Sequence, residues 1–457
     1  MIAHLTEEYT ILSDKFQEFR TNSSFPSRID TNDASVPDAF KIYKYPVTAW
    51  PVLINKDMTD ELKEMSLKIP GLMQKIPALY FEDDIKKIAD FYFEGNEILA
   101  EFAMMCHAKN LEIGCRLDLT YTQDGFKILE ANIGSSLGGW QIQNFETLIR
   151  RNHPELADEN KKENYRTRNT MQLYIKFLVE HIIKFVGNKN KTLNLFVDMR
   201  DIQDELEKKQ SLDFLDIFFK QELDKRGLKG EVFTGNMDSM ELIDGNLRLG
   251  DKIIHGIIVL TMDVNVTPVV FRAFMMDKVY LPDHIGLSML GDKRNLSLLL
   301  ELAQKGKFSP EENALILKSI PWTSFVENKK TIFKNKEIDL PEFLKTNKEQ
   351  FVIKASRGYQ GKDVFIGKFL NDSEWNEALE TALKSCAFIA QEFSDSLGFS
   401  APNEQNEWTP HKLIWGAFGF GDCYGGVWVR MSEVKTDVGV INSATGAVEA
   451  IVFEIAN

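Results

Sequence analysis

The chain has 457 residues, of which 44% are hydrophobic and 27% are charged, and its formal net charge is −14. That length predicts two or three packed subdomains, while the acidic balance argues against a protein that neutralises a nucleic-acid backbone. The four cysteines form no CxxC pair, which argues against a zinc site or a disulfide framework and favours a reducing compartment.

The first 131 residues divide into a turn-rich, a helical and a hairpin part. Six prolines between Pro26 and Pro77 predict short elements and turns over residues 1–80. Apolar residues at helical spacing from residue 83 to residue 109 predict two helices separated at Gly95. Two strands, Leu117–Tyr121 and Phe126–Ala131, are predicted to form a hairpin around the turn at residues 123–125.

The middle of the chain alternates between strands and helices. A long amphipathic helix is expected over residues 166–186, and strand and helix patterns then alternate to residue 290. This alternation predicts a small open α/β domain with parallel strands at 189–290. The expected strands are 193–198, 229–234, 253–261 and 278–281, and the expected helices are 214–226 and 266–276. The final third is expected to begin with a helix near Lys293 and to end in glycine-interrupted strands from Phe351 onward.

The hairpin carries a group of polar residues that could bind a metal. Arg116 and Asp118 share one face of the first strand, and Glu130 and Asn132 share one face of the second, because side chains alternate with period two. Two carboxylates and a carboxamide suit Mg²⁺, which completes its shell with phosphate oxygens, and the arginine could hold a phosphoryl group. An ordinary charged surface hairpin with a DG turn explains this segment equally well.

A lysine followed by a glycine-rich loop indicates a second candidate site. The strand Phe351–Lys354 ends in a lysine and continues through Arg357, Gly358 and Gly361 to another strand at 364–366. Glycines allow backbone N–H groups to approach phosphate oxygens, and the basic side chains supply compensating charge. The segment is not a Walker A loop, because GxxxxGK[ST] is absent and no helix follows directly. Without other motifs, an ordinary turn would account for it.

Two strand patterns near the C-terminus carry further candidates. The strand at 388–393 ends in Gln391 and Glu392, which could contact an adenine and its sugar. Arg430 is expected on one strand and Asn442 on its antiparallel neighbour, so that both could converge on phosphates or a metal. Taken separately, Gln391 and Glu392 could equally be an ordinary polar strand end, and Arg430 could equally be an ordinary salt-bridge partner.

Together these motifs resemble the working parts of ATP-grasp enzymes. A further similarity is Gly291-Asp292-Lys293, followed by a helix and Ile320-Pro321, which looks like the entry to an ATP-grasp domain, where the lysine reaches the nucleotide phosphates. The α/β region at 189–290 precedes this entry, where the family places its pre-ATP-grasp domain. Ordinary members carry the Asp…Glu-x-Asn hairpin last, whereas here it precedes the lysine loop.

That order resembles circularly permuted ATP-grasp proteins of the glutathionylspermidine synthetase type. The resemblance implies an α/β (α+β) fold, namely a permuted ATP-grasp fold with a pre-ATP-grasp open α/β domain. The expected division is an irregular or helical N-terminal region at 1–95 with a substrate site, and a permuted subdomain with the metal hairpin at 96–188. The α/β domain at 189–290 and the ATP-binding subdomain at 291–457 follow. Residues after Asn132 and after the Arg430 strand depart from that type, and no N-terminal amidase domain is visible, so polyamine and glutathione specificity do not carry over.

The resemblance implies a ligase that uses ATP and Mg²⁺ to join a carboxylate to an amine through an acyl phosphate. In that scheme the metal ligands are Asp118, Glu130 and Asn132, and the catalytic arginines are Arg116 and Arg430. ATP would be bound by Lys293, Lys354, Arg357, Gly358, Gly361, Gln391 and Glu392. A phosphotransferase on the same fold and a non-catalytic ATP-binding protein remain as alternatives.

The resemblance implies the partners, and the composition and apolar patterning indicate the location. Small-molecule or peptide carboxylates and amines are the expected partners, and the oligomeric state stays open, a homodimer included. The N-terminus lacks a signal-peptide pattern, and the longest apolar run, near residues 257–262, is too short to span a bilayer. We therefore expect a cytoplasmic protein with no membrane and no nucleic-acid partner.

Overall fold

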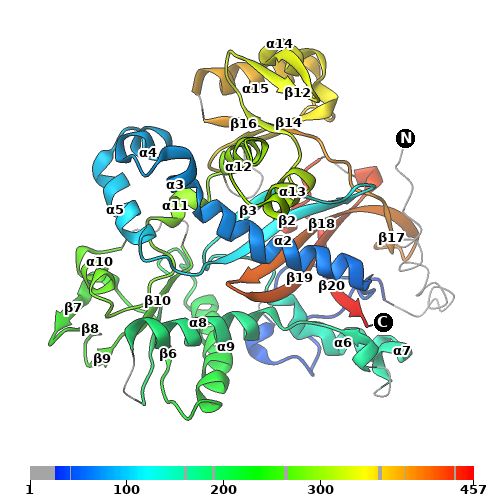
Figure 1. Ribbon diagram of the computed structural model, residues 1–457. Helices are drawn as coiled ribbons and strands as arrows, with labels where there is room; N and C mark the ends of the chain where they lie inside the picture. Colours follow the sequence, from blue (N-terminus) through cyan, green and yellow to red (C-terminus); the bar gives the residue numbers. More distant parts are fainter. Residues whose placement is uncertain are drawn as a thin grey trace.

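A computed structural model describes residues 26–41, 43–158, 162–187, 191–261, 266–358, 363–385, 387–436 and 439–456. The chain is mixed α/β, as predicted, and its largest sheet joins the two ends of the sequence. In Figure 1 the cyan hairpin lies beside the orange and red strands of the C-terminal part. The sheet order is β1 (Val52–Ile54), β20 (Val448–Ile455), β19 (Cys423–Glu433), β18 (Trp408–Phe420), β2 (Gly114–Thr122) and β3 (Gly125–Ile133), with β17 (Phe399–Pro402) on β18 and β4 (Tyr165–Arg166) on β20.

The predicted hairpin is confirmed and is longer than expected. Strands β2 and β3 pair antiparallel around the turn, with Asp118 opposite Glu130 and Arg116 opposite Asn132. A register shift after Asp118 bends the hairpin at that point. Strand β18 pairs antiparallel with the other edge of β2, so residues near 416 become neighbours of residues near 118.

Helix α2 (Lys56–Gln74) crosses the large sheet and corrects the expectation of short elements up to residue 80 (Figure 1). Its buried face includes Met65 and Ile69, and α3 (Ile76–Phe81) follows directly. Pro70 cannot donate to the Ser66 carbonyl four residues earlier, which would normally disfavour a helix. Here that carbonyl accepts from the Cys115 thiol at 3.5 Å, so packing on the sheet overrides the local signal.

The helices predicted around Gly95 are confirmed as α4 (Ile85–Tyr92) and α5 (Glu97–His107), each with a side-chain N-cap, Asp84 and Asn96. The amphipathic helix expected at 166–186 is α8 (Thr170–Val186), which begins after its cap, Asn169. In the described part of the chain, no helix is both long and apolar enough to cross a membrane.

The small parallel sheet is confirmed in the order β10 (Gly256–Val259), β5 (Leu195–Asp198), β6 (Val232–Phe233). The expected strand at 278–281 is reduced to a single bridge between Gly256 and Tyr280. Helix α9 (Glu205–Asp224) begins earlier than predicted, because Asp204 caps its first turn. Helix α10 (Pro268–Met275) follows β10, and β7 (Met240–Ile243), β8 (Asn246–Leu249) and β9 (Lys252–Ile253) form a separate antiparallel sheet.

A four-stranded antiparallel sheet lies at the top of Figure 1 with α14 (Leu340–Thr346) and α15 (Asp372–Ser385). Its order is β11 (Thr323–Phe325), β16 (Phe388–Glu392), β14 (Phe351–Ala355), β15 (Val364–Ile366). The predicted strand–loop–strand is therefore confirmed in its strands, whereas Gly361 lies outside the described residues. The remaining main elements are α6 (Glu146–Asn152), α7 (Pro154–Ala157), α11 (Leu287–Leu290), α12 (Asn295–Gln304), α13 (Pro310–Ser319), β12 (Lys330–Phe333) and β13 (Lys336–Asp339).

The expected strand that would carry Asn442 is wrong. Residues 439–442 form no strand, and the neighbour of β19 is β20, which begins at Val448. Asn442 instead caps a short 3₁₀ turn, accepting from the Ala444 amide at 3.2 Å. The cross-strand partner of Arg430 is consequently Glu449.

Candidate active site

A cavity of about 680 Å³ lies between the large sheet and the four-stranded sheet. Strands β2, β3, β18 and β19 provide one wall, and β14 and β16 provide another. The remaining wall comes from Phe40, Tyr43, Lys44 and Tyr45, the loop after β3 and helix α9. The predicted site residues that line the cavity are Arg116, Asp118, Glu130, Asn132, Lys354, Gln391, Glu392 and Arg430.

Asp118 lies between two arginines that come from opposite ends of the sequence. Arg116 Nε donates to its Oδ1 at 2.7 Å, and Arg430 Nη2 donates to its Oδ2 at 2.8 Å. Burial would raise the pKa of Asp118, but the charges and hydrogen bonds of the two guanidiniums outweigh it and hold that pKa at about 2. The carboxylate is therefore ionised throughout the physiological range.

The ring of Trp428 supports both guanidiniums. Its centroid lies 5.0 Å from Cζ of Arg116 and 4.4 Å from Cζ of Arg430. Arg430 Nε is buried and has no hydrogen-bond partner among the described residues. A buried donor without a partner carries a free-energy cost that an anionic ligand in the cavity would relieve.

Glu130 and Asn132 lie beside this cluster on β3. Glu130 Oε1 is 3.2 Å from Lys293 Nζ, and Asn132 Nδ2 donates to the Arg116 carbonyl at 3.4 Å. Together with Asp118 they place two carboxylates and a carboxamide on adjoining positions of one hairpin. This donor set fits Mg²⁺, which takes one or two carboxylates and phosphate oxygens, although the arginines and Lys293 now neutralise the carboxylates.

Lys354 reaches the cavity from strand β14. Its Nζ donates to Gln391 Oε1 at 2.7 Å and to the Leu129 carbonyl at 3.1 Å, and Gln391 in turn donates to Thr323 Oγ1 at 3.2 Å. Desolvation lowers the pKa of Lys354 to about 8. An ammonium group has three donors, so one remains for a ligand after these two contacts.

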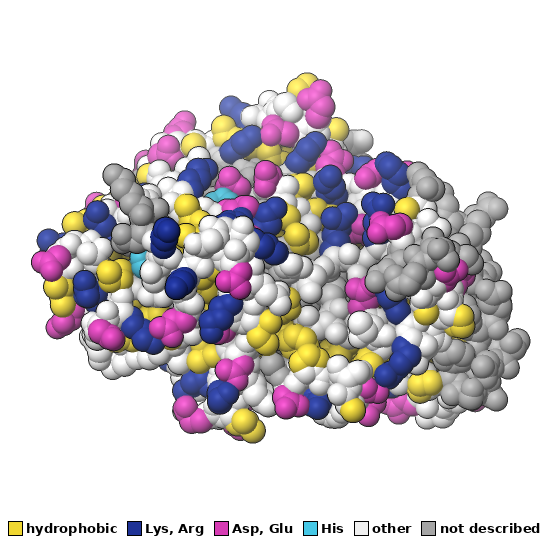
Figure 2. All heavy atoms as spheres, turned by 90° about the horizontal axis from the view of Figure 1, so that it is seen from below, with side chains coloured by type: hydrophobic (Ala, Val, Ile, Leu, Met, Phe, Trp, Pro, Cys, Tyr) yellow, Lys and Arg dark blue, Asp and Glu magenta, His cyan; other side chains and the backbone are white. Residues whose placement is uncertain are grey.

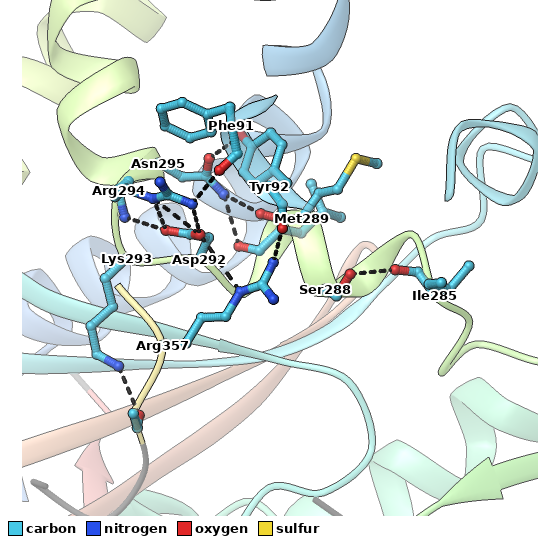
Figure 3. Close-up of polar contacts among 12 residues, drawn as sticks. Phe91, Tyr92, Ile285, Ser288, Met289, Asp292, Lys293, Arg294, Asn295 and Arg357 are labelled. Atoms are coloured by element: carbon cyan, nitrogen blue, oxygen red, sulfur yellow. Dashed lines mark hydrogen bonds and ion pairs between the residues drawn. The ribbon is translucent and has the colours of Figure 1, made fainter. Parts of the chain in front are cut away.

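The Gly-Asp-Lys segment is held by a network of hydrogen bonds and ion pairs, drawn in Figure 3. Asp292 accepts from Arg294 Nη2 at 2.7 Å, and Lys293 Nζ donates to the Gly358 carbonyl at 2.8 Å. Arg357 donates to the Tyr92 carbonyl, and its Nε lies 3.9 Å from Asp292. The structure therefore brings Lys293 to Glu130 but leaves the Arg357 side chain outside the cavity wall.

Several lining residues had no signal in the motifs. The lining residues outside the motifs include Phe40, Tyr43, Lys44, Tyr45, the loop at 135–141 and Glu449. Only the loop could have been noticed, because Gly138 and Gly139 follow Asn132 closely. Gly139 has a φ of +87°, and a Cβ there would lie 2.1 Å from the Trp428 ring. The glycine thus allows the loop to pack on the ring that supports both arginines.

Comparison with known proteins bears on the fold. No protein-family model matches the chain, and no curated protein matches it in sequence. The apo structure of a glutathione synthetase-like effector from Globodera pallida matches over 98% of each chain, with a TM-score of 0.59 and 13% identity. The chain shares the fold of that effector. A proposed gamma-glutamylcysteine synthetase from Methylobacillus flagellatus KT matches over 86% of each chain at 11% identity, and its TM-score of 0.43 is too low to carry an argument.

Proposed function

We propose that this protein is an ATP- and Mg²⁺-dependent ligase that joins a carboxylate to an amine on a circularly permuted ATP-grasp fold. The observation that carries the proposal is the convergence of Lys354, Arg430 and the Asp118–Glu130–Asn132 set on one cavity, although they are far apart in sequence. The fold shared with a glutathione synthetase-like effector supports the same class of reaction.

The sheet topology supports the permutation. The β2–β3 hairpin precedes every other element that carries a motif residue of the site, yet it pairs with β18, near the C-terminus. Connecting residue 457 notionally to the segment before residue 96 would place the hairpin last, as in unpermuted relatives. The division of the chain into the regions 1–95, 96–188, 189–290 and 291–457 is part of this proposal.

Each residue group has a role in the proposed scheme. Lys354 and Lys293 donate to nucleotide phosphates, and Gln391 and Glu392 contact the adenosine end, with Gly358 and Gly361 in the covering loop. Asp118, Glu130 and Asn132 would hold Mg²⁺, which supplies positive charge at the phosphate oxygens. Arg357 enters the scheme only if its guanidinium leaves the Tyr92 carbonyl.

The arginines act on the reacting oxygens. Substrate carboxylate oxygen attacks the γ-phosphorus and ADP leaves, which gives an acyl phosphate. The ammonium substrate gives one proton to water, its nitrogen attacks the acyl carbon, and phosphate leaves with the second proton. Both steps build negative charge on oxygen, next to Arg116 and Arg430. Arg430 Nε, which has no partner among the described residues, is a donor available for that charge.

The test is an ATPase screen with pools of amino acids, short peptides and polyamines, followed by mass spectrometry of the product. We expect ADP, phosphate and an amide from one pool. A phosphoester would identify the phosphotransferase alternative, and binding of ATP without turnover in any pool would favour the non-catalytic one.

The matched variants are Glu130→Gln in the site and Asp124→Asn at the exposed turn of the same hairpin. Glu130→Gln should lower substrate-stimulated ATP hydrolysis by about a hundredfold or more, because it removes a charge at the reacting phosphates. Asp124→Asn should leave the rate unchanged. Equal rates for Glu130→Gln and the parent protein would refute the metal assignment.

A further inference from the structure

One lobe of the cavity is aromatic and belongs to none of the motifs. Phe40 packs on Phe214 of α9 with ring centroids 4.8 Å apart, and Trp140 lies 5.4 Å from Phe214. Tyr43 lies 5.4 Å from Phe145, and all five rings line the cavity. On the face of the molecule seen from below, hydrophobic side chains gather near the middle, with charged ones around them (Figure 2). The five rings offer apolar faces on which a ring or a short alkyl chain of a ligand can pack.

The carboxylates along the cavity differ in their partners. Within the described residues, Glu449 is the one lining carboxylate that forms no salt bridge; the others pair with Lys or Arg, and they are Asp118, Glu130, Glu207, Glu392 and Asp395. Glu449 is fully buried and accepts from Ser443 Oγ at 2.5 Å and from the Tyr43 hydroxyl. Burial raises the pKa of Glu449, against the opposing effect of these hydrogen bonds and of Arg430.

Backbone pairing fixes Tyr43 at this position. The Glu449 amide donates to the Pro46 carbonyl at 2.8 Å, and the Thr48 amide donates to the Glu449 carbonyl at 2.9 Å. The segment that carries Tyr43 is thereby held against β20. Tyr43 and Glu449 both line the cavity, and the phenol proton is directed to the carboxylate.

This arrangement favours a cation. A phenol that donates to a carboxylate becomes a stronger acceptor, and the aromatic faces around it attract positive charge. Among the described residues of this wall an anion would find no free lysine, because Lys44 pairs with Glu207 at 2.8 Å. The neighbouring cation, Arg430, is the cross-strand partner of Glu449 and donates to Asp118. The arginines that would hold the acyl phosphate lie on the wall formed by β2 and β19.

We propose that the aromatic lobe binds the amine substrate as an ammonium ion carried on an apolar, ring-sized body, with the ammonium on the Tyr43 oxygen and Glu449 behind it. The identity of this ligand as a substrate rests on the proposed ligase function, whereas its binding does not. Tyr43 and Glu449 are binding residues that select a cation, and Phe40, Trp140 and Phe214 select the apolar body.

The experiment measures binding of 2-phenylethylamine and of its neutral isostere 2-phenylethanol to the full chain by calorimetry at pH 7. We expect the amine to bind about tenfold or more tightly than the alcohol, which corresponds to one hydrogen bond to a charged group. Tyr43→Phe keeps the ring and should remove this preference. Tyr45→Phe, at a neighbouring lining tyrosine, should keep it. Phe214→Ala should weaken both ligands together.

Glu449→Gln should also remove the preference for the amine. Because Glu449 is buried, this variant could fail to fold, and Tyr43→Phe then decides the test. Equal affinity for amine and alcohol, an unchanged preference in Tyr43→Phe, or no binding of either ligand would each overturn the proposal. The rise in melting temperature caused by ATP and Mg²⁺ is measured on the same samples. That rise tests the ligase function separately, because the lobe residues lie outside the nucleotide wall.

Discussion

Gly139→Ala tests the link between the loop after β3 and the two arginines. An alanine at the φ of +87° costs about 1–2 kcal/mol of folding free energy from backbone strain. Its Cβ would also lie 2.1 Å from Cδ2 of Trp428, so the loop or the ring must move, at about 1–3 kcal/mol for overpacking. We therefore expect a loss of roughly 2–5 kcal/mol in the free energy of unfolding.

Gly446→Ala is the matched control, because that glycine has a φ of +96° and nothing lies within 4 Å of its Cβ position. Urea denaturation of both variants should show the strain alone in Gly446→Ala and the additional packing cost in Gly139→Ala. Displacement of Trp428 should also weaken ATP-dependent turnover, since that ring supports Arg116 and Arg430. Equal destabilisation by the two variants would refute the packing argument.

Three further results are expected. Asp118→Asn leaves two buried guanidiniums without their shared counter-charge and should destabilise by about 3–5 kcal/mol at pH 7. The pKa of Asp118 is lowered to about 2, so its stabilising effect is full above the pKa of an unfolded aspartate and is lost as the pH falls toward 2. The difference in the free energy of unfolding between Asp118→Asn and the parent protein, measured with urea, should therefore narrow on acidification. For Lys354, whose pKa is lowered to about 8, the unfolded chain binds more protons between pH 8 and about 10.5, so stability should rise with pH in that window relative to Lys354→Met. ATP with Mg²⁺ at about 100 times its Kd should add about 2.7 kcal/mol to the parent protein and nothing to Lys354→Met; the same gain in both would contradict the role of Lys354.

Local sequence signals were most reliable where one element decides the geometry. The period-two pattern and the DG turn sufficed to predict the hairpin that carries Asp118 and Glu130, because a hairpin needs only its own two strands, but the register shift that sets these two residues opposite each other was not predicted. The alternation at 189–290 likewise predicted a parallel sheet. Errors arose where packing opposes local propensity, as at Pro70 in α2, or where the neighbouring strand was misjudged, as at Asn442.

The sequence by itself determined the chemistry available to this protein: a carboxylate–carboxamide hairpin, followed later in the chain by a Gly-Asp-Lys segment and a strand that ends in a lysine. The tertiary structure alone decided which of these meet. Arg430 donates to a carboxylate 312 positions away because β18 joins β19 to β2, and Arg357 is held at the Tyr92 carbonyl instead of the cavity. Residue 43 meets Glu449 only through the backbone pairing of its segment with β20. The face of a side chain and the presence of a hairpin are local properties, whereas the partner of a strand edge is selected by the packing of the whole chain.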